Sequence, residues 1–273
     1  MRKMVQVALV TLLVAVLGLV AWRLRGDRGP MYHGKALQVW LQRYVSRNPS
    51  NGGRISVGPE AEADAAVRQM GANAIPTLLH MVRAHDTKLK IALLRLASKP
   101  RFVGEDFLIT AIRPALLVQQ QAVVAFHALG ASASNAVPVL IQTYRERIGL
   151  DSQCACAEAL GCIGPAASEA IPDLICAATN SDQRLRLVAV EALGNLHADS
   201  ALVVPVLTRS LQDPNRWLQL LALRSLTGFG AQATSAIPVL RQLLKDGSPD
   251  VRANAAEALK QIDPEASPKR GNK

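Results

Sequence analysis

The stretch 215–247 contains two amphipathic segments in succession. In the first, apolar or small residues recur at spacings of three and four, which places them on one face of a helix. They are Leu218, Ala222, Ser225, Leu226 and Phe229. The second begins at Pro238 and carries its own stripe of leucines. Gly230 separates the two, and glycine adopts the backbone conformation that often ends a helix. The pattern predicts two short antiparallel helices, with Thr234 or Ser235 capping the second.

This pattern recurs along most of the chain at intervals of about 33 residues. The position of Ser225 is occupied by a small residue in the other copies: Ala66, Ala125, Ala159, Ala192 and Ala258. A proline opens the second segment of five copies: Pro76, Pro138, Pro172, Pro205 and Pro238. Small residues allow helices to approach closely, and branched residues interdigitate between them. So regular a period indicates a solenoid of stacked helix pairs.

The turns 130–138, 164–172 and 230–238 share the pattern Gly-x-x-Ala-x-x-Ala-Ile/Val-Pro. Together with the leucine-rich second helices, they resemble short bacterial HEAT-like repeats of the type described in phycobilin lyases. The resemblance covers roughly 58–263 and implies an all-α fold, a right-handed α-solenoid of stacked antiparallel helix pairs without strands. It departs from the family in the degenerate unit 86–117, and in an arginine column that is only partly kept. Arg186 and Arg252 keep that column, whereas three glutamines replace it: Gln119, Gln153 and Gln219.

The N-terminus carries an unbroken apolar run over residues 4–22, behind Arg2 and Lys3. A helix of this length spans about 28 Å, enough for a hydrocarbon core of about 30 Å. A cleaved signal peptide has a shorter apolar region and a small-x-small cleavage site, and this run ends in a poor one. We therefore expect residues 1–25 to form an uncleaved transmembrane or signal-anchor helix, with one pass through a bacterial inner membrane. The flanking charges do not decide its orientation. Similar anchored bacterial repeat proteins are exported, so we expect a periplasmic repeat domain.

Three further segments follow from composition. Residues 26–57 are expected to form a linker and an N-capping helix, which places Leu37, Trp40, Leu41 and Tyr44 against the first repeat. The alternative is an aromatic binding box around Trp40. Residues 46–58 have the composition of a flexible loop. Residues 58–263 form the HEAT-like repeat domain, closed by a single helix over 249–262, and 264–273 form a disordered tail.

The net charge of +10 raises the question of nucleic-acid binding. Most of the excess lies in the two termini and in 83–113, so the other repeats are close to neutral. A nucleic-acid-binding solenoid would carry a basic stripe along its face, and we do not expect nucleic acid as a partner. Anionic lipid headgroups could equally account for a basic patch near the anchor, and so could a merely solvated charged face.

A candidate partner-binding face follows from the second helices. Positions four and seven after the proline share a side that is not the apolar one. The candidate residues there are Arg83, Gln142, Arg145, Arg209, Gln242 and Lys245. This polar, mildly basic surface suits a peptide or an acidic protein segment; the alternative is a merely solvated helix face.

The residues that could support chemistry form no recognisable motif. Cys154 and Cys156 fall on packing positions, whereas Cys162 and Cys176 fall on polar positions. A disulfide between Cys162 and Cys176 is an alternative if the domain is exported. The Cys-x-Cys spacing is not that of a zinc site. The histidines are scattered, with His197 in place of a turn glycine, and no glycine-rich phosphate loop follows a strand. Carboxylates are spread singly over positions expected to face solvent, Glu158 and Glu191 among them.

We therefore predict no catalytic, cofactor or metal site. The favoured function is a membrane-anchored HEAT-repeat scaffold that mediates protein–protein interaction. One alternative is an accessory or enzymatic HEAT-repeat protein of the phycobilin-lyase type. The other is a nucleic-acid-binding solenoid.

Overall fold

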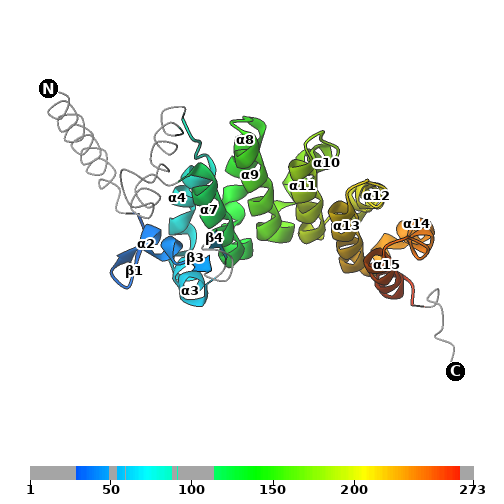
Figure 1. The fold of residues 1–273 in the computed structure, drawn as a ribbon. Coiled ribbons are helices and arrows are strands. Elements are labelled where there is room, and N and C mark those ends of the chain that lie inside the picture. The colour runs from blue at the N-terminus through cyan, green and yellow to red at the C-terminus, as the bar shows by residue number, and fades with distance from the viewer. Residues whose placement is uncertain (1–28, 49–53, 59, 88–90, 92–113, 265–273) are drawn as a thin grey trace.

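The computed structural model describes residues 29–48, 54–58, 60–87, 91 and 114–264. Its helices stack in antiparallel pairs that form one curved row, from α3 at one end to α15 at the other (Figure 1). The expected membrane anchor, most of the unit 86–117 and the tail after Pro264 lie outside the described residues.

Each repeat pairs a longer first helix with a shorter second helix. The first helices are α3 (Ala61–Met70), α7 (Ala115–Leu129), α9 (Leu150–Ile163), α11 (Gln183–Leu196) and α13 (Arg216–Phe229). The second helices are α4 (Ile75–Val82), α8 (Val137–Arg145), α10 (Ile171–Ala178), α12 (Ser200–Ser210) and α14 (Ile237–Leu243). The single helix α15 (Pro249–Ile262) ends the row, with the bounds that the sequence predicts.

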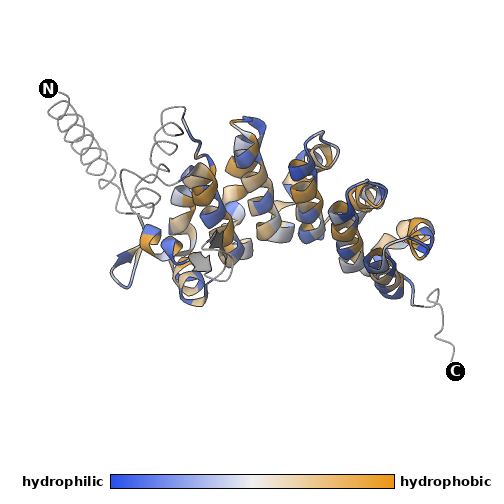
Figure 2. Ribbon diagram, in the orientation of Figure 1, coloured by the Kyte–Doolittle hydropathy of each residue, from blue (hydrophilic) through white to orange (hydrophobic). Residues whose placement is uncertain are grey.

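The core runs through the middle of this row. The small-residue column is buried at Ala66, Ala125, Ala159, Ala192 and Ala258, and the leucines two positions after all five prolines are buried with it. Figure 2 shows hydrophobic and hydrophilic residues alternating along each helix, as expected when one side packs against neighbours. The predicted solenoid of stacked helix pairs is therefore confirmed for the described repeats.

One described stretch, Ala115–Arg145, has the length and apolarity of a membrane-crossing helix. It comprises α7, the turn after it and α8, and half of its most apolar window is buried inside the protein. Its hydrophobicity is thus explained by packing in the solenoid core.

Short 3₁₀ helices join the two members of most pairs: η2 (Gly71–Ala74), η3 (Gly130–Ala136), η4 (Gly164–Ala170) and η5 (Gly230–Ala236). The first residue of each is a glycine with φ between 51° and 77°. This conformation is unfavourable for a residue with a Cβ. The expected capping role of Thr234 or Ser235 is wrong, because α14 follows η5 directly and Ala236, which has no side-chain acceptor, occupies the N-cap position. The Ile237 amide donates to the Thr234 backbone carbonyl. His197 takes the left-handed conformation at the end of α11, so its expected role as a turn residue is confirmed.

The N-terminal cap contains strands, which corrects the all-α prediction. β1 (Met31–Tyr32) pairs antiparallel with β2 (Lys35–Ala36), and β3 (Val45–Asn48) pairs antiparallel with β4 (Arg54–Val57). The expected loop at 46–58 thus contains most of a hairpin. The apolar residues Ile55 and Val57 alternate with polar neighbours, a period-two signal that the loop-like composition around them outweighed.

The capping helix itself, α2 (Leu37–Gln42), is only six residues long. It packs against α3 and α7, and the Gln121 side chain on α7 donates to the Leu41 carbonyl at 2.8 Å. Trp40 and Tyr44 are buried, and the cations of Lys35 and Arg43 lie over the Trp40 ring at 5.0 and 5.6 Å. This favours the capping role over the alternative of an open aromatic binding box.

Candidate partner-binding surface

The predicted face lies on the second helices, which follow one edge of the row. In Figure 1, α8, α10, α12 and α14 lie along the upper edge. Of the six candidate residues, Arg83 is half-buried just after α4, and the other five are exposed: Gln142, Arg145, Arg209, Gln242 and Lys245. The sequence therefore predicted the exposure of five of these side chains. The structure divides the candidates into a group that bonds to other residues of the protein and a group that does not.

The N-terminal group is engaged within the protein. Arg145 donates through Nε and Nη2 to the two carboxylate oxygens of Asp173 on α10, at 3.1 and 2.8 Å. Arg83 donates to the Thr143 hydroxyl at 3.1 Å and pairs with Glu146. These arginines link second helices of different units, although such exposed ion pairs contribute little to stability.

The C-terminal group makes no such contacts. Within the described residues, Arg209, Gln242 and Lys245 form no hydrogen bond or ion pair through their side chains. The nearby carboxylates are already engaged, because Asp213 pairs with Arg186 and Asp246 pairs with Arg216. Arg209 and Lys245 therefore leave unneutralised positive charge on α12 and just after α14.

A cleft of about 430 Å³ opens beside Arg209. It lies between the loop after α10 and the loop after α12, where Ala178, Val206 and Leu218 give it an apolar lining. Thr179 and Gln212 contribute polar groups to the same cleft. The cleft thus combines a free guanidinium with an apolar surface.

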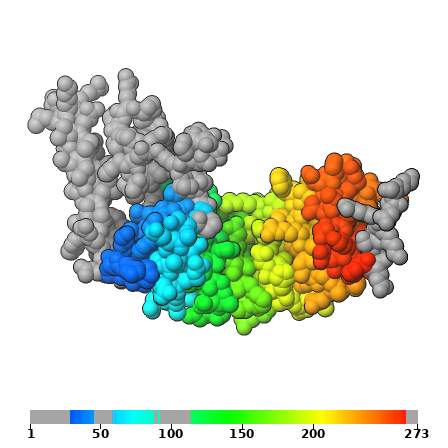
Figure 3. All heavy atoms as spheres, turned by 90° about the horizontal axis from the view of Figure 1, so that it is seen from below, coloured from blue at the N-terminus to red at the C-terminus, as the bar shows by residue number. Residues whose placement is uncertain are grey.

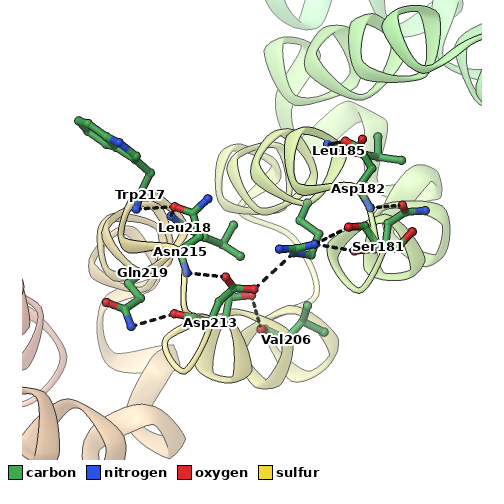
Figure 4. Close-up of polar contacts among 12 residues, drawn as sticks. Ser181, Asp182, Leu185, Val206, Asp213, Asn215, Trp217, Leu218 and Gln219 are labelled. Atoms are coloured by element: carbon green, nitrogen blue, oxygen red, sulfur yellow. Dashed lines mark hydrogen bonds and ion pairs between the residues drawn. The ribbon is translucent and has the colours of Figure 1, made fainter.

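Arg186 contacts both loops of this cleft, whose residues Ser181 and Asp213 are labelled in Figure 4. Its Nη1 donates to the carbonyl oxygens of Asn180 and Ser181 at 2.9 and 3.0 Å, and its Nε lies 3.3 Å from Asp213 Oδ2. Asp213 in turn accepts from the backbone amide of Asn215 at 2.8 Å. Arg186, near the start of α11, therefore links the loop after α10 to the loop after α12 through Asp213.

The glutamines that replace the arginine column make the same kind of backbone contact. Gln219 donates to the Asp213 carbonyl at 2.9 Å, and Gln119 donates to the Ala84 carbonyl at 2.6 Å, much as Arg252 donates to the Asp246 carbonyl at 2.8 Å. Gln153 makes a longer contact, 3.4 Å, to the Tyr144 carbonyl. An amide carries no charge, so the glutamine repeats keep the loop contact without an ion pair of the Arg186–Asp213 kind.

The first helices carry two further clefts, of about 500 and 180 Å³, which share Glu191, Asn195 and Arg224. Glu158 lines the larger one and is half-buried, so its expected solvent-facing position is wrong. Burial raises the pKa of the Glu158 carboxyl, against the lowering effect of Arg184, and Glu191 adds to the increase. The sequence could not predict this burial of Glu158, because the spacing of residues along one helix does not show how far side chains of the neighbouring helices extend around it.

The four cysteines are free. Cys154 and Cys156 are buried as expected, and burial raises the pKa of their thiols to about 11 and about 12. Cys162 is half-buried in the larger first-helix cleft, where burial raises its pKa to about 12, whereas Cys176 is exposed on α10. In the part of the chain that the structure describes, no group of three His, Cys, Asp or Glu side chains is arranged to hold a metal ion.

Residues 204–269 match a family model described as HEAT repeats. No curated protein sequence matches the chain. One similar solved structure is an engineered protein of the Northeast Structural Genomics Consortium, with 19% identity and a TM-score of 0.46 over 75% of this chain and 92% of that chain. Another is a designed armadillo repeat protein in complex with the peptide (KR)4, with 15% identity and a TM-score of 0.45 over 71% of this chain and 94% of that chain. The described helix pairs form a repeat solenoid, and residues 204–269 of it are similar to HEAT repeats.

Proposed function

We propose that this chain is a non-catalytic scaffold that binds a protein or peptide partner on its second-helix face. The observation that carries the proposal is the exposure of Arg209, Gln242 and Lys245, whose side chains are unpaired among the described residues, together with the cleft that Arg209 lines. A solenoid presents an extended surface to which successive repeats each contribute side chains. The free charge on this one is positive, which suits an acidic segment.

The proposal includes an N-terminal membrane anchor. It rests on the apolar run 4–22 of the sequence, which has the length of a membrane-spanning helix. In this arrangement the anchor holds the solenoid at a bacterial inner membrane, with the repeats in the periplasm. A partner of the scaffold would then be periplasmic or would itself span the membrane.

The test of the partner surface is an affinity pull-down from gently solubilised membranes, read by mass spectrometry. We expect the wild type to retain a partner that the double variant Arg209→Ser/Lys245→Ser loses. Arg145→Ser is the matched control, because it removes an exposed arginine whose charge is already neutralised by Asp173. Equal recovery by all three proteins would place the partner elsewhere, and a small molecule that co-purifies without any protein would contradict the scaffold.

Cys176 offers a test of the membrane side, since its side chain is exposed and the other three cysteines are buried or half-buried. A membrane-impermeant maleimide added to cells with a permeabilised outer membrane should label the wild type but not Cys176→Ser. Labelling only after the inner membrane is disrupted would put the repeats in the cytoplasm. Deletion of residues 1–25 should move the protein to the soluble fraction, and retention in membranes would contradict the anchor.

A further inference from the structure

We propose that the cleft between the loops after α10 and α12 binds an acidic side chain of the partner at Arg209. The same partner segment places an aliphatic side chain against Ala178, Val206 and Leu218. This inference rests on the proposed function and deepens it, because it names the binding site and the chemistry that the site recognises.

The charges around the cleft favour an acidic ligand. Arg186 forms an ion pair with Asp213 and donates hydrogen bonds to two loop carbonyls, those of Asn180 and Ser181. Its positive charge is therefore already neutralised within the protein. Arg209 lines the cleft, is exposed, and has no bonding partner among the described side chains. A guanidinium in this state can bind a carboxylate through two parallel hydrogen bonds.

The position is distinctive within the repeat array. The residues four positions after the proline in the other copies are His80, Gln142, Cys176 and Gln242. Among the five residues of this column, only Arg209 is an arginine. It lines the same cleft as Arg186. The two features together make the α10–α12 junction different from the α12–α14 junction, where Gln219 stands in the place of Arg186.

The apolar lining favours an aliphatic neighbour to the acidic residue. Ala178 is 6% exposed and Leu218 is 1% exposed, whereas Val206 is half-buried and still partly reachable from solvent. In an extended peptide, side chains two residues apart point to the same side. An acidic and an aliphatic side chain separated by one residue could therefore both enter the cleft.

The test uses three rhodamine-labelled peptides and fluorescence anisotropy with the purified chain. The first peptide is Glu-Ser-Leu-Ser repeated twice. The second replaces each Glu by Lys, and the third replaces each Leu by Ser. We expect the first to bind at least about tenfold more tightly than the lysine peptide, the ratio that one lost charge-assisted contact produces. It should bind about threefold more tightly than the third peptide, which loses only apolar contact. Added salt should weaken the binding of the first peptide.

Variants of the chain then locate the binding. Arg209→Gln should weaken the Glu-Ser-Leu-Ser peptide about tenfold, and Val206→Ser should weaken it about threefold through lost apolar contact. Arg224→Gln is the matched control, since it removes an exposed arginine from the first-helix clefts, and its affinity should equal that of the wild type. Thermal unfolding should be unchanged in Arg209→Gln, because that side chain bonds to no described residue.

Each contrary outcome is informative. Wild-type affinity in Arg209→Gln, equal binding of the lysine peptide, or no binding of any peptide would overturn the inference. If the pull-down still shows a partner lost by Arg209→Ser/Lys245→Ser, the proposed scaffold function survives such a result and the cleft does not. If the pull-down also shows no difference between the wild type and the double variant, the proposed second-helix binding face is wrong as well.

Discussion

At the scale of single residues, the array tolerates different side chains where one backbone contact is preserved. Gln219 and Arg252 both reach back to a carbonyl of the preceding loop, although one is neutral and the other charged. The loop carbonyl is the common requirement, because a backbone acceptor without a partner is costly when partly buried. The glutamine at position 219 therefore makes the same kind of backbone contact as the arginine at position 252.

Glu158 leads to a prediction on pH. Its folded-state pKa lies above the unfolded value because of burial, so the native state retains the proton to higher pH. The free energy of unfolding must then fall as pH rises from the unfolded pKa through the raised one. Glu158→Gln removes this titration, and we expect it to raise the melting temperature at pH 7 by about 2 °C. The gain should vanish near pH 4, below the range in which the carboxyl ionises.

The measurement is thermal unfolding between pH 4 and pH 7. Glu257→Gln is the control, because that glutamate occupies the same repeat column and is exposed. A difference between Glu158→Gln and the wild type that does not change with pH would contradict the assignment of the effect to ionisation.

At the scale of the elements, the close approach of successive first helices depends on glycine. A Cβ on Gly161 would lie 2.8 Å from the Cα of Ala192, and one on Gly194 would lie 2.1 Å from the Ser225 hydroxyl. The small-residue columns of the sequence thus have a structural cause at the α9–α11 and α11–α13 contacts. These glycines also leave the first-helix clefts open, since Gly161 and Gly194 line them.

We predict that Gly161→Ala lowers stability by about 1–3 kcal/mol, the usual cost of overpacking, although alanine is intrinsically the better helix former. Gly194→Ala should lower it too, but its clash is with a side chain. Adding Ser225→Gly should therefore restore part of the loss at position 194, whereas no side-chain change relieves the backbone contact at position 161. Urea unfolding of the four proteins checks this, and a stabilising effect of Gly161→Ala would show that α9 and α11 are less closely packed.

The sequence predicted helices more completely than it predicted the short elements. The period of the apolar residues locates α13 and α15, because each helix contains several turns of the same pattern. The 3₁₀ segment η5 and the β3–β4 hairpin are too short for a period to be read with certainty. Their formation depends on neighbours as well, since β4 (Arg54–Val57) contacts α7 (Ala115–Leu129), which is far away in the sequence.

At the scale of the whole molecule, the last described helix, α15, has no second helix paired with it among the described residues. α15 buries Val251, Ala255 and Leu259 against α13 and α14, and its outer side is mostly polar. The space-filling view shows the row as one elongated body with α15 at its far end (Figure 3). Solenoids need such a cap, because the last repeat would otherwise expose an apolar side.

Deletion of residues 249–273 is therefore expected to cause self-association and a lower melting temperature. The control deletes only 265–273, which leaves α15 intact and should behave as the full chain. Size-exclusion chromatography with thermal unfolding measures both effects. A monomeric, equally stable protein after the longer deletion would mean that α15 is dispensable as a cap.

The sequence by itself determined the repeat architecture and which side of each helix is buried, since both follow from local periodicity. It also placed Arg209, Gln242 and Lys245 at the surface, because these residues share a non-apolar side of their helices. Only the tertiary structure decided which arginines are free, since Arg145 meets Asp173 across 28 residues of sequence, as does Arg83 with Glu146 across 63. It decided the clefts in the same way: their depth depends on the height of side chains from adjacent repeats, which no pattern along a single helix contains.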